Sequence, residues 1–165
     1  TKNFEATTVG ENKRAWHTAE GMTYLYNNDL SQFDGDFWPT IDPNRLPGTT
    51  VDSAQPSADE AGKHSTGEPW VGGAEVGNRY GVVGMQLKGR LSPPEIPYNG
   101  ARAKKSWFLF DDEIVALGAD ITYVETTGGV IETIVENRKI DSNTIPATLT
   151  VDNQAVTLTS TKQTV

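Results

Sequence analysis

The chain contains no cysteine, and this absence excludes a disulfide framework, a thiolate metal site and a cysteine nucleophile. It also lacks any apolar run near the roughly 20 residues that a membrane-spanning helix needs, so we expect no membrane partner. No segment keeps apolar residues at helical spacing over three turns, which argues against long amphipathic helices. The missing features therefore leave a β-rich globular protein as the main possibility.

Positive charge is also scarce. The 14 Lys and Arg residues face 22 Asp and Glu, for a net charge of -8 and a pI near 4.7. The basic residues are scattered, whereas a nucleic-acid binder normally carries a basic stripe, so we expect no nucleic-acid partner. The acidity also opposes binding of a polyanionic sugar by this chain alone, because like charges repel along a cleft.

The composition favours β-structure, since Thr, Val and Ile suit half-buried pleated surfaces. With 165 residues the chain is long enough to bury a core. We predict an all-β fold, an antiparallel β-sandwich, forming a single domain over residues 1–165. Because the chain starts at Thr1 without Met or a signal peptide and ends on a polar stretch, we expect a cut end and an incomplete sandwich.

Individual strands can be located from local patterns. Residues 107–110 (WFLF) are apolar on both faces, as in a central strand, and a turn at residues 111–112 leads to a return strand at 114–117. Residues 131–139 predict another strand, with Ile131, Thr133 and Val135 on one face. Residues 149–158 predict a hairpin that turns at Asp152-Asn153, where both residue types tolerate positive φ.

Two segments interrupt the strand pattern. Residues 51–77 are rich in Gly, Ser, Ala, Asp and Glu, and a loop of this length usually serves binding or is a mobile insertion. Residues 92–97 contain three prolines, too many for pairing in a sheet interior.

Several motifs resemble those of a known protein family in their residues and in their order along the chain. They are residues 15–27 (AWHTAEGMTYLYN), 37–42 (FWPTID), 45–50 (RLPGTT), 103–108 (AKKSWF) with 111–118 (DDEIVALG), 132–139 (ETIVENRK) and 149–152 (LTVD). Together they resemble the central β-domain of polysaccharide lyase family 8, which contains hyaluronate, chondroitin AC and xanthan lyases. The matches cover nearly the whole chain and are weakest over residues 54–78.

The resemblance implies a secreted enzyme that cleaves an acidic polysaccharide by β-elimination. In this family a helical toroid domain packs beside the β-sandwich across a long cleft, and an Asn, a His, a Tyr and an Arg of the toroid carry the chemistry. No position of this chain matches them, so we expect no catalytic residue here and take the missing helical domain as the partner of this one.

The family's β-domain contributes a Glu and an Asn to the cleft, just before a Glu-Asn pair. The pair is present as Glu11-Asn12, but counting back without a gap places Ala6 and Val9 at the two upstream positions. Glu5 fits the Glu position only with a one-residue insertion, so either the loop is remodelled around Glu5 or this protein lacks part of that contact. From this resemblance we predict Glu5 as a cleft carboxylate and Asn12 as a loop-ordering or sugar-contacting amide.

Other chemically suggestive residues have structural explanations. His17, with Tyr24 and Tyr26, could form a base and acid set, but a lone histidine among strands is more often a structural hydrogen-bonding residue. His64 lies in the polar loop and is expected to be solvated. We predict Trp16, Trp38 and Trp107 as core residues, because burying an indole stabilises a sandwich strongly.

Trp70 differs from the other tryptophans because it lies in the Gly-rich loop. An exposed aromatic in a binding loop could serve as a sugar-stacking platform, so we include it among the substrate-binding candidates.

Asp42, Asn44 and Asp52 surround a Pro-Gly turn and could supply oxygen ligands. A calcium ion needs six to eight oxygens, and these residues lack the spacing of a calcium loop. Turn capping by Asp and Asn explains them without a metal. We therefore predict no cofactor, with structural calcium as the alternative.

Three functional classes remain open. The chain is part of a secreted polysaccharide lyase, a noncatalytic carbohydrate-binding module, or a structural sandwich of a surface protein. The family motifs favour the lyase, and an adjoining helical domain would discriminate it from the others. The motif at residues 44–52 resembles hyaluronate and xanthan lyases equally, so the polymer stays undecided.

Overall fold

The computed structural model describes residues 17–28, 30–53, 68–89, 91–92, 96–97, 100–123, 129–139 and 149–157. Its elements, in chain order, are η1 (Ser31–Phe33), α1 (Phe37–Thr40), β1 (Thr50–Asp52), β2 (Val71–Val76), β3 (Tyr80–Lys88), β4 (Leu91–Ser92), β5 (Ile96–Pro97), β6 (Ala101–Leu109), β7 (Ile114–Tyr123), β8 (Ile131–Thr133), β9 (Leu149–Val151) and β10 (Gln154–Val156). Among these elements no helix is long and apolar enough to cross a membrane.

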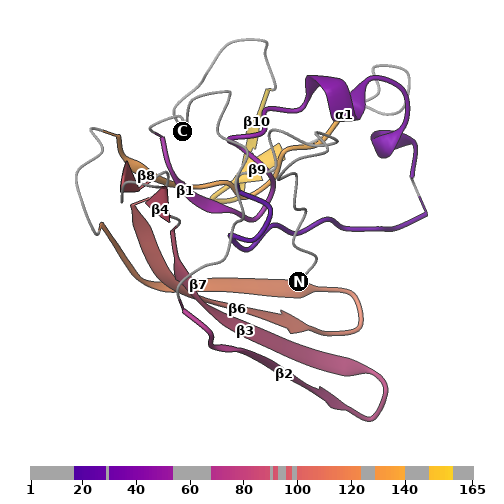
Figure 1. Ribbon diagram of the computed structural model, residues 1–165. Helices are drawn as coiled ribbons and strands as arrows, with labels where there is room; N and C mark the ends of the chain where they lie inside the picture. The colour runs from indigo at the N-terminus through magenta and orange to yellow at the C-terminus, as the bar shows by residue number, and fades with distance from the viewer. Residues whose placement is uncertain are drawn as a thin grey trace. The chain divides into compact units, whose positions relative to one another are not determined.

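The chain divides into two compact units. The first comprises residues 1–25 and 40–137, and the second comprises residues 26–39 and 138–165. The first unit contains an antiparallel four-stranded sheet in the order β2-β3-β6-β7 (Figure 1). The predicted central strand is confirmed, because β6 pairs with β3 on one side and with β7 on the other.

The turn between β6 and β7 also follows the prediction. Phe110 N donates to Glu113 O at 2.9 Å, so the two aspartates at 111–112 occupy the tip of the connection. β7 then runs from Ile114 to Tyr123, longer than the four residues that the apolar pattern predicted. Aspartates lack strand propensity and accept turn conformations, which explains why this boundary could be read from the sequence.

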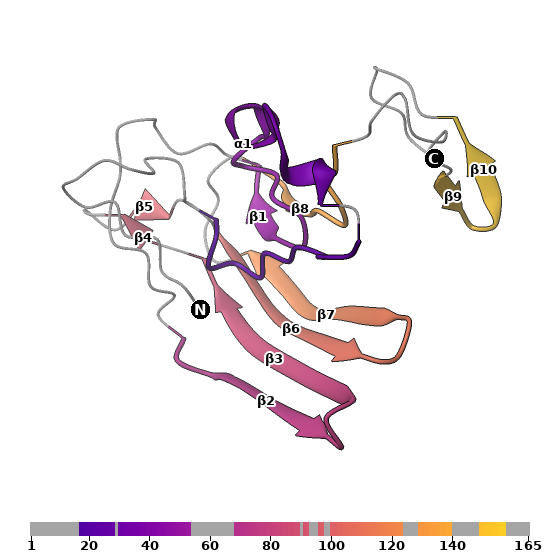
Figure 2. The same cartoon turned by 90° about the vertical axis from the view of Figure 1, so that its right-hand side faces the viewer.

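The two faces of the sheet differ in what covers them. On one face Leu87 lies opposite Ala103, and both are buried, as is Ala101. The β1 strand pairs antiparallel with β8 and contacts β6, so this short pair forms a second layer (Figures 1 and 2). The opposite face carries Gly84 and Ser106 in register with Leu117. The predicted all-β, antiparallel fold is confirmed.

The strand predicted over residues 131–139 is shorter than expected. β8 ends at Thr133, and Val135 is 87% exposed rather than sharing a covered face with Ile131. The reason is the partner segment: Ile134 donates to Thr49 O at 2.9 Å and accepts from Gly48 N at 2.7 Å, where the partner backbone already turns. Gly48 has a φ of 79°, so the partner backbone leaves the extended conformation there and the pairing ends.

The predicted loop over residues 51–77 contains strand at both ends. Val51 and Asp52 belong to β1, and residues 71–76 form β2, whereas residues 54–67 lie outside the described part. The glycines of β2 account for the incorrect loop prediction, because glycine is typical of loops. A Cβ on Gly73 would lie 2.7 Å from Val82 O, so glycine permits close pairing here.

The second unit contains an aromatic cluster and a hairpin. Phe33 lies 5.0 Å from Tyr26, 5.5 Å from Phe37 and 6.0 Å from Trp38, measured between ring centroids. Trp38 is nevertheless 53% exposed, so its prediction as a core residue was wrong. Trp107 of the first unit is half-buried, and Trp16 lies outside the described residues.

The hairpin of the second unit joins β9 to β10. Asp152 and Asn153 adopt positive φ of 50° and 64°, which confirms the predicted turn. Two consecutive residues with positive φ give a turn whose twist matches that of the flanking strands.

Candidate functional site

Trp70 stands at the edge of the four-stranded sheet, immediately before β2. Its carbonyl oxygen accepts a hydrogen bond of 3.0 Å from Gln86 N, which extends the ladder by one residue. The indole edge lies over Gly84, where an added Cβ would come within 2.9 Å of the ring carbon Cη2. Because Gly84 has no Cβ, the Trp70 indole can lie directly against the backbone there. This contact holds the Trp70 side chain in place although it is 58% exposed.

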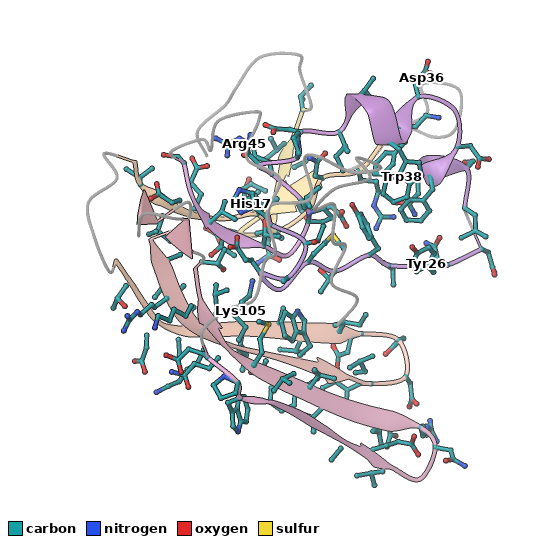
Figure 3. All side chains as sticks on the ribbon, viewed as in Figure 1. His17, Tyr26, Asp36, Trp38, Arg45 and Lys105 are labelled. Carbon is teal, nitrogen blue, oxygen red and sulfur yellow. The ribbon has the colours of Figure 1, made fainter. Side chains whose placement is uncertain are left out.

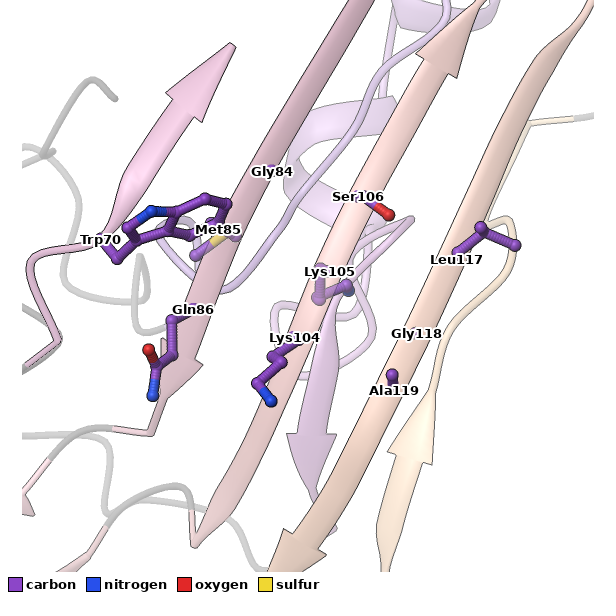
Figure 4. Close-up of a pocket in the computed structure, with 10 residues that line it drawn as sticks. All are labelled: Trp70, Gly84, Met85, Gln86, Lys104, Lys105, Ser106, Leu117, Gly118 and Ala119. Carbon is purple, nitrogen blue, oxygen red and sulfur yellow. The ribbon is translucent and has the colours of Figure 1, made fainter.

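The Trp70 indole borders an open groove of about 480 Å³ on the sheet (Figure 4). Trp70 stands at one side and Leu117 at the other, with Gly84 and Gly118 leaving space between them. Polar groups come from Gln86, Lys104 and Ser106. An aromatic wall with a few polar side chains is the usual composition of a small-molecule site.

A second cluster lies buried on the other side of the same sheet, around His17. His17 is 1% exposed, and its Nδ1 lies 2.5 Å from Glu20 Oε2, which is also buried. Burial lowers the pKa of His17, but the Glu20 carboxylate raises it, with help from Asn44 and Asp42, and the net pKa is raised. His17 is thus a buried histidine paired with Glu20, whose carboxylate favours its protonated form, and its prediction as a structural hydrogen-bonding residue is confirmed.

Two polar atoms of this cluster, His17 Nε2 and Asn44 Oδ1, are buried and have no hydrogen-bond partner within normal limits. They are a complementary donor and acceptor when the imidazole is protonated, and Asn44 contributes to the raised pKa of His17. A protonated His17 therefore donates to Glu20 through Nδ1, whereas Nε2 forms no hydrogen bond in this structure.

Lys105 reaches the same cluster from β6. Its side chain is buried, and Nζ donates to Gly48 O. Burial lowers the pKa of Lys105 to about 8, although the Glu20 carboxylate opposes this shift. In Figure 3, His17 and Arg45 lie with Lys105 on the covered side of the sheet.

Gly48 is the meeting point of the motif segments. Thr23 N donates to Pro47 O at 2.9 Å, and Gly48 N donates to Ile134 O at 2.7 Å. Gly48 has a φ of 79°, and a Cβ there would lie 2.8 Å from Gly21 O. Residues 17–25, 45–50, 103–108 and 132–137 of the motifs thus pack at one junction in the first unit, which explains these motifs by structure rather than by catalysis.

The Asp42 turn is capped as predicted. Asp42 Oδ1 accepts from Asn44 N at 2.9 Å, and Arg45 forms an ion pair with Glu132 of β8. Asp52 differs from the prediction, because it lies buried in β1 and not at this turn. Within the described ranges, no three His, Cys, Asp or Glu side chains gather as a metal site would require.

The structure places one of the three predicted substrate-binding residues. Trp70 lies at the groove, whereas Glu5 and Asn12 lie outside the described residues and stay predictions. The polar partners Gln86 and Lys104 were missed by sequence reasoning. They face each other across β3 and β6, a register that no local pattern reveals.

Comparison with known proteins identifies the family. The model of the polysaccharide lyase family 8 super-sandwich domain matches residues 1–165. The chain is 46% identical over 151 residues to hyaluronate lyase HylB of Enterococcus faecalis, covering 86% of this chain and 14% of that protein. It is 49% identical over 131 residues to xanthan lyase of Bacillus sp. strain GL1, covering 79% of this chain and 13% of that protein.

A further relative is hyaluronate lyase of Staphylococcus aureus, 36% identical over 136 residues, covering 82% of this chain and 16% of that protein. The chain therefore spans only a small part of the length of these relatives. The family model nevertheless covers every residue of the chain. This chain belongs to polysaccharide lyase family 8 and is similar to the super-sandwich domain of its members.

Proposed function

We propose that this chain is the β-sandwich portion of a secreted polysaccharide lyase that cleaves uronic-acid polymers by β-elimination. The observation that carries the proposal is the family match over residues 1–165, together with relatives named hyaluronate lyase and xanthan lyase. The substrate class is an acidic polysaccharide, either of the hyaluronate and chondroitin kind or of the xanthan kind.

The proposed chemistry needs three kinds of group: donors that neutralise a carboxylate, a base and an acid. The C5 proton of a uronate is poorly acidic until hydrogen-bond donors neutralise its carboxylate. A positioned base then removes the proton, and an acid protonates the leaving oxygen. His17 is buried against Glu20 and cannot reach a polymer, and we therefore assign the base and the acid to another domain of the full-length protein.

The role we assign to this chain is to support the substrate cleft. Glu5 and Asn12 are the proposed cleft residues, and Trp70 adds an exposed aromatic surface. A noncatalytic carbohydrate-binding role is the second candidate, favoured by the groove beside Trp70.

Mass spectrometry of the products tests the proposal. The full-length protein is incubated with hyaluronate, chondroitin and xanthan in turn. Elimination leaves an unsaturated end that is one water lighter than the product of hydrolysis. Unsaturated fragments from any of these polymers support the lyase, whereas binding without fragments supports the second candidate and removes the first.

A further inference from the structure

Basic residues gather beside the Trp70 groove, although the chain as a whole carries a net charge of -8. In the β3–β6 ladder Lys88 lies opposite Arg102, and Gln86 lies opposite Lys104. Residues directly opposite in an antiparallel pair point to the same face, and alternate positions along a strand share it. Lys88, Arg102 and Lys104 therefore form a basic strip on the face that carries the groove.

The carboxylates near this basic strip leave its positive charge available to an anionic ligand. Lys104 Nζ lies 2.5 Å from Asp120 Oδ2, and Lys88 Nζ lies 4.0 Å from Glu68 Oε1. Asp120 sits at the β7 bulge with a φ of 50°, and the pair with Lys104 is well exposed. Exposed ion pairs contribute about 0–1 kcal/mol, so an incoming carboxylate can compete for the ammonium group.

We propose that the Trp70 groove is an accessory subsite for an acidic polysaccharide, with the indole stacking on a sugar ring and the strip of Lys88, Arg102 and Lys104 binding uronate carboxylates. Gln86 and Ser106 are positioned to hydrogen-bond with ring hydroxyls between these two features. Aromatic faces pair with the apolar side of a ring, and guanidinium groups bind carboxylates in a bidentate manner.

The fixed position of Trp70 supports this role. Its backbone is bonded to Gln86, and its ring is seated on Gly84, so little freedom is lost when a ligand binds. By strand alternation, the side chains of Gln86, Lys104 and Ser106 that line the groove lie on the face opposite the side chains of Lys105 and Leu87. The subsite rests on the proposed function for its ligand class, but it does not depend on where cleavage occurs.

An accessory subsite affects the binding of long polymers and of short oligosaccharides differently. A second contact on the same molecule raises the affinity for a polymer that reaches both sites, and a short fragment gains nothing. The full-length Trp70→Ala protein should therefore lose affinity for the polymer by a larger factor than it loses affinity for a tetrasaccharide.

The experiment compares retardation of full-length variants in native gels cast with hyaluronate, chondroitin or xanthan. Trp70→Ala should weaken polymer binding by about fivefold, and Trp70→Phe should restore most of it. Tyr80→Ala is the matched control, since Tyr80 is an exposed aromatic at the other end of the same sheet. Tyr80→Ala should leave retardation unchanged.

A charge series tests the strip in the same gels. Lys104→Gln should weaken retardation and its salt dependence, and Lys104→Arg should retain both. Arg79→Gln, at the far end of the sheet beside Asp111, is the control cation.

The two proposals fail in different ways. Unchanged retardation in both Trp70→Ala and Lys104→Gln overturns the accessory subsite, whatever products the wild type forms. Absence of unsaturated product from every polymer overturns the lyase, whereas Trp70-dependent retardation would still support the subsite.

Discussion

At the scale of single residues, the least expected feature is a charged cluster inside an acidic β-protein. His17, Glu20 and Lys105 are all buried, and Glu20 raises the pKa of both basic partners. Burying charges is costly unless each finds a partner, and removal of one partner leaves the others uncompensated. This dependence makes Glu20 the residue whose loss the junction should tolerate least.

Replacing Glu20 by Gln in the full-length protein should destabilise it by about 3 kcal/mol, the cost of breaking a buried pair. Thermal unfolding of the variant measures this, with the exposed Glu113→Gln as control. A loss no larger than that of Glu113→Gln would contradict the buried-pair description.

The same variant should show a defined pH dependence. Since the folded-state pKa of His17 is raised, its stabilisation is fully present below the ordinary value of 6.5 and is lost as pH rises through the folded pKa. The difference between wild type and Glu20→Gln should therefore be larger at about pH 6 than at about pH 9. Glu20 also raises the pKa of Lys105, so the loss of this interaction contributes to the difference in the same direction, whereas Asp42 is retained in both proteins.

At the scale of elements, turns specified by local chemistry were predictable from the sequence. The Asp152-Asn153 hairpin and the connection from β6 to β7 both follow from residues that tolerate turn conformations. β2 was not predicted because Gly72 and Gly73 are typical of loops. The end of β8 was not predicted because it depends on a distant partner strand, in which Thr50 pairs with Thr133.

The candidate site was predictable only in part for the same reason. Trp70 could be chosen from its setting in a Gly-rich segment. Two further features depend on strand register, which is a tertiary property: the contact of the Trp70 indole with Gly84, and the pairing of Gln86 with Lys104.

Gly48→Ala should destabilise the protein by more than about 1 kcal/mol, because φ is 79° and the new Cβ would meet Gly21 O at 2.8 Å. Gly72→Ala is a matched control, since a Cβ there would meet nothing within 4 Å. Thermal unfolding of both full-length variants makes the comparison. Equal midpoints for the two would show that the junction does not require glycine at residue 48.

At the scale of the whole molecule, the four-stranded sheet leaves much apolar surface uncovered by the described residues. Val71 and Val76 on β2, and Ile114 and Leu117 on β7, are all exposed. These two strands also form the edges of the sheet, and open edges recruit further strands. We therefore expect the surrounding protein to supply part of the stability of this unit.

The isolated 165-residue chain should accordingly self-associate or unfold at a low temperature. Light scattering of the purified chain across a dilution series measures this. A dilute monomer with a sharp, cooperative transition well above ordinary mesophile temperatures would contradict the expectation.

The N-terminal segment carries a separate prediction about turnover. Glu5→Ala and Asn12→Ala in the full-length enzyme should each lower kcat by about tenfold or more, with little loss of thermal stability. The physical reason is that a residue that orders a catalytic group across a cleft affects the reaction more than folding. Unchanged kinetics in both variants would make this segment structural only.

The central claim is that this chain is a supporting domain of a lyase whose catalytic groups lie elsewhere in the full-length protein. The most direct measurement is the ultraviolet absorbance of unsaturated uronate, followed for the full-length protein and for residues 1–165 side by side on each polymer. We predict a steady rise for the full-length protein on at least one polymer and none for the isolated chain. Product from the isolated chain, or no product from the full-length protein on any polymer, would contradict this account.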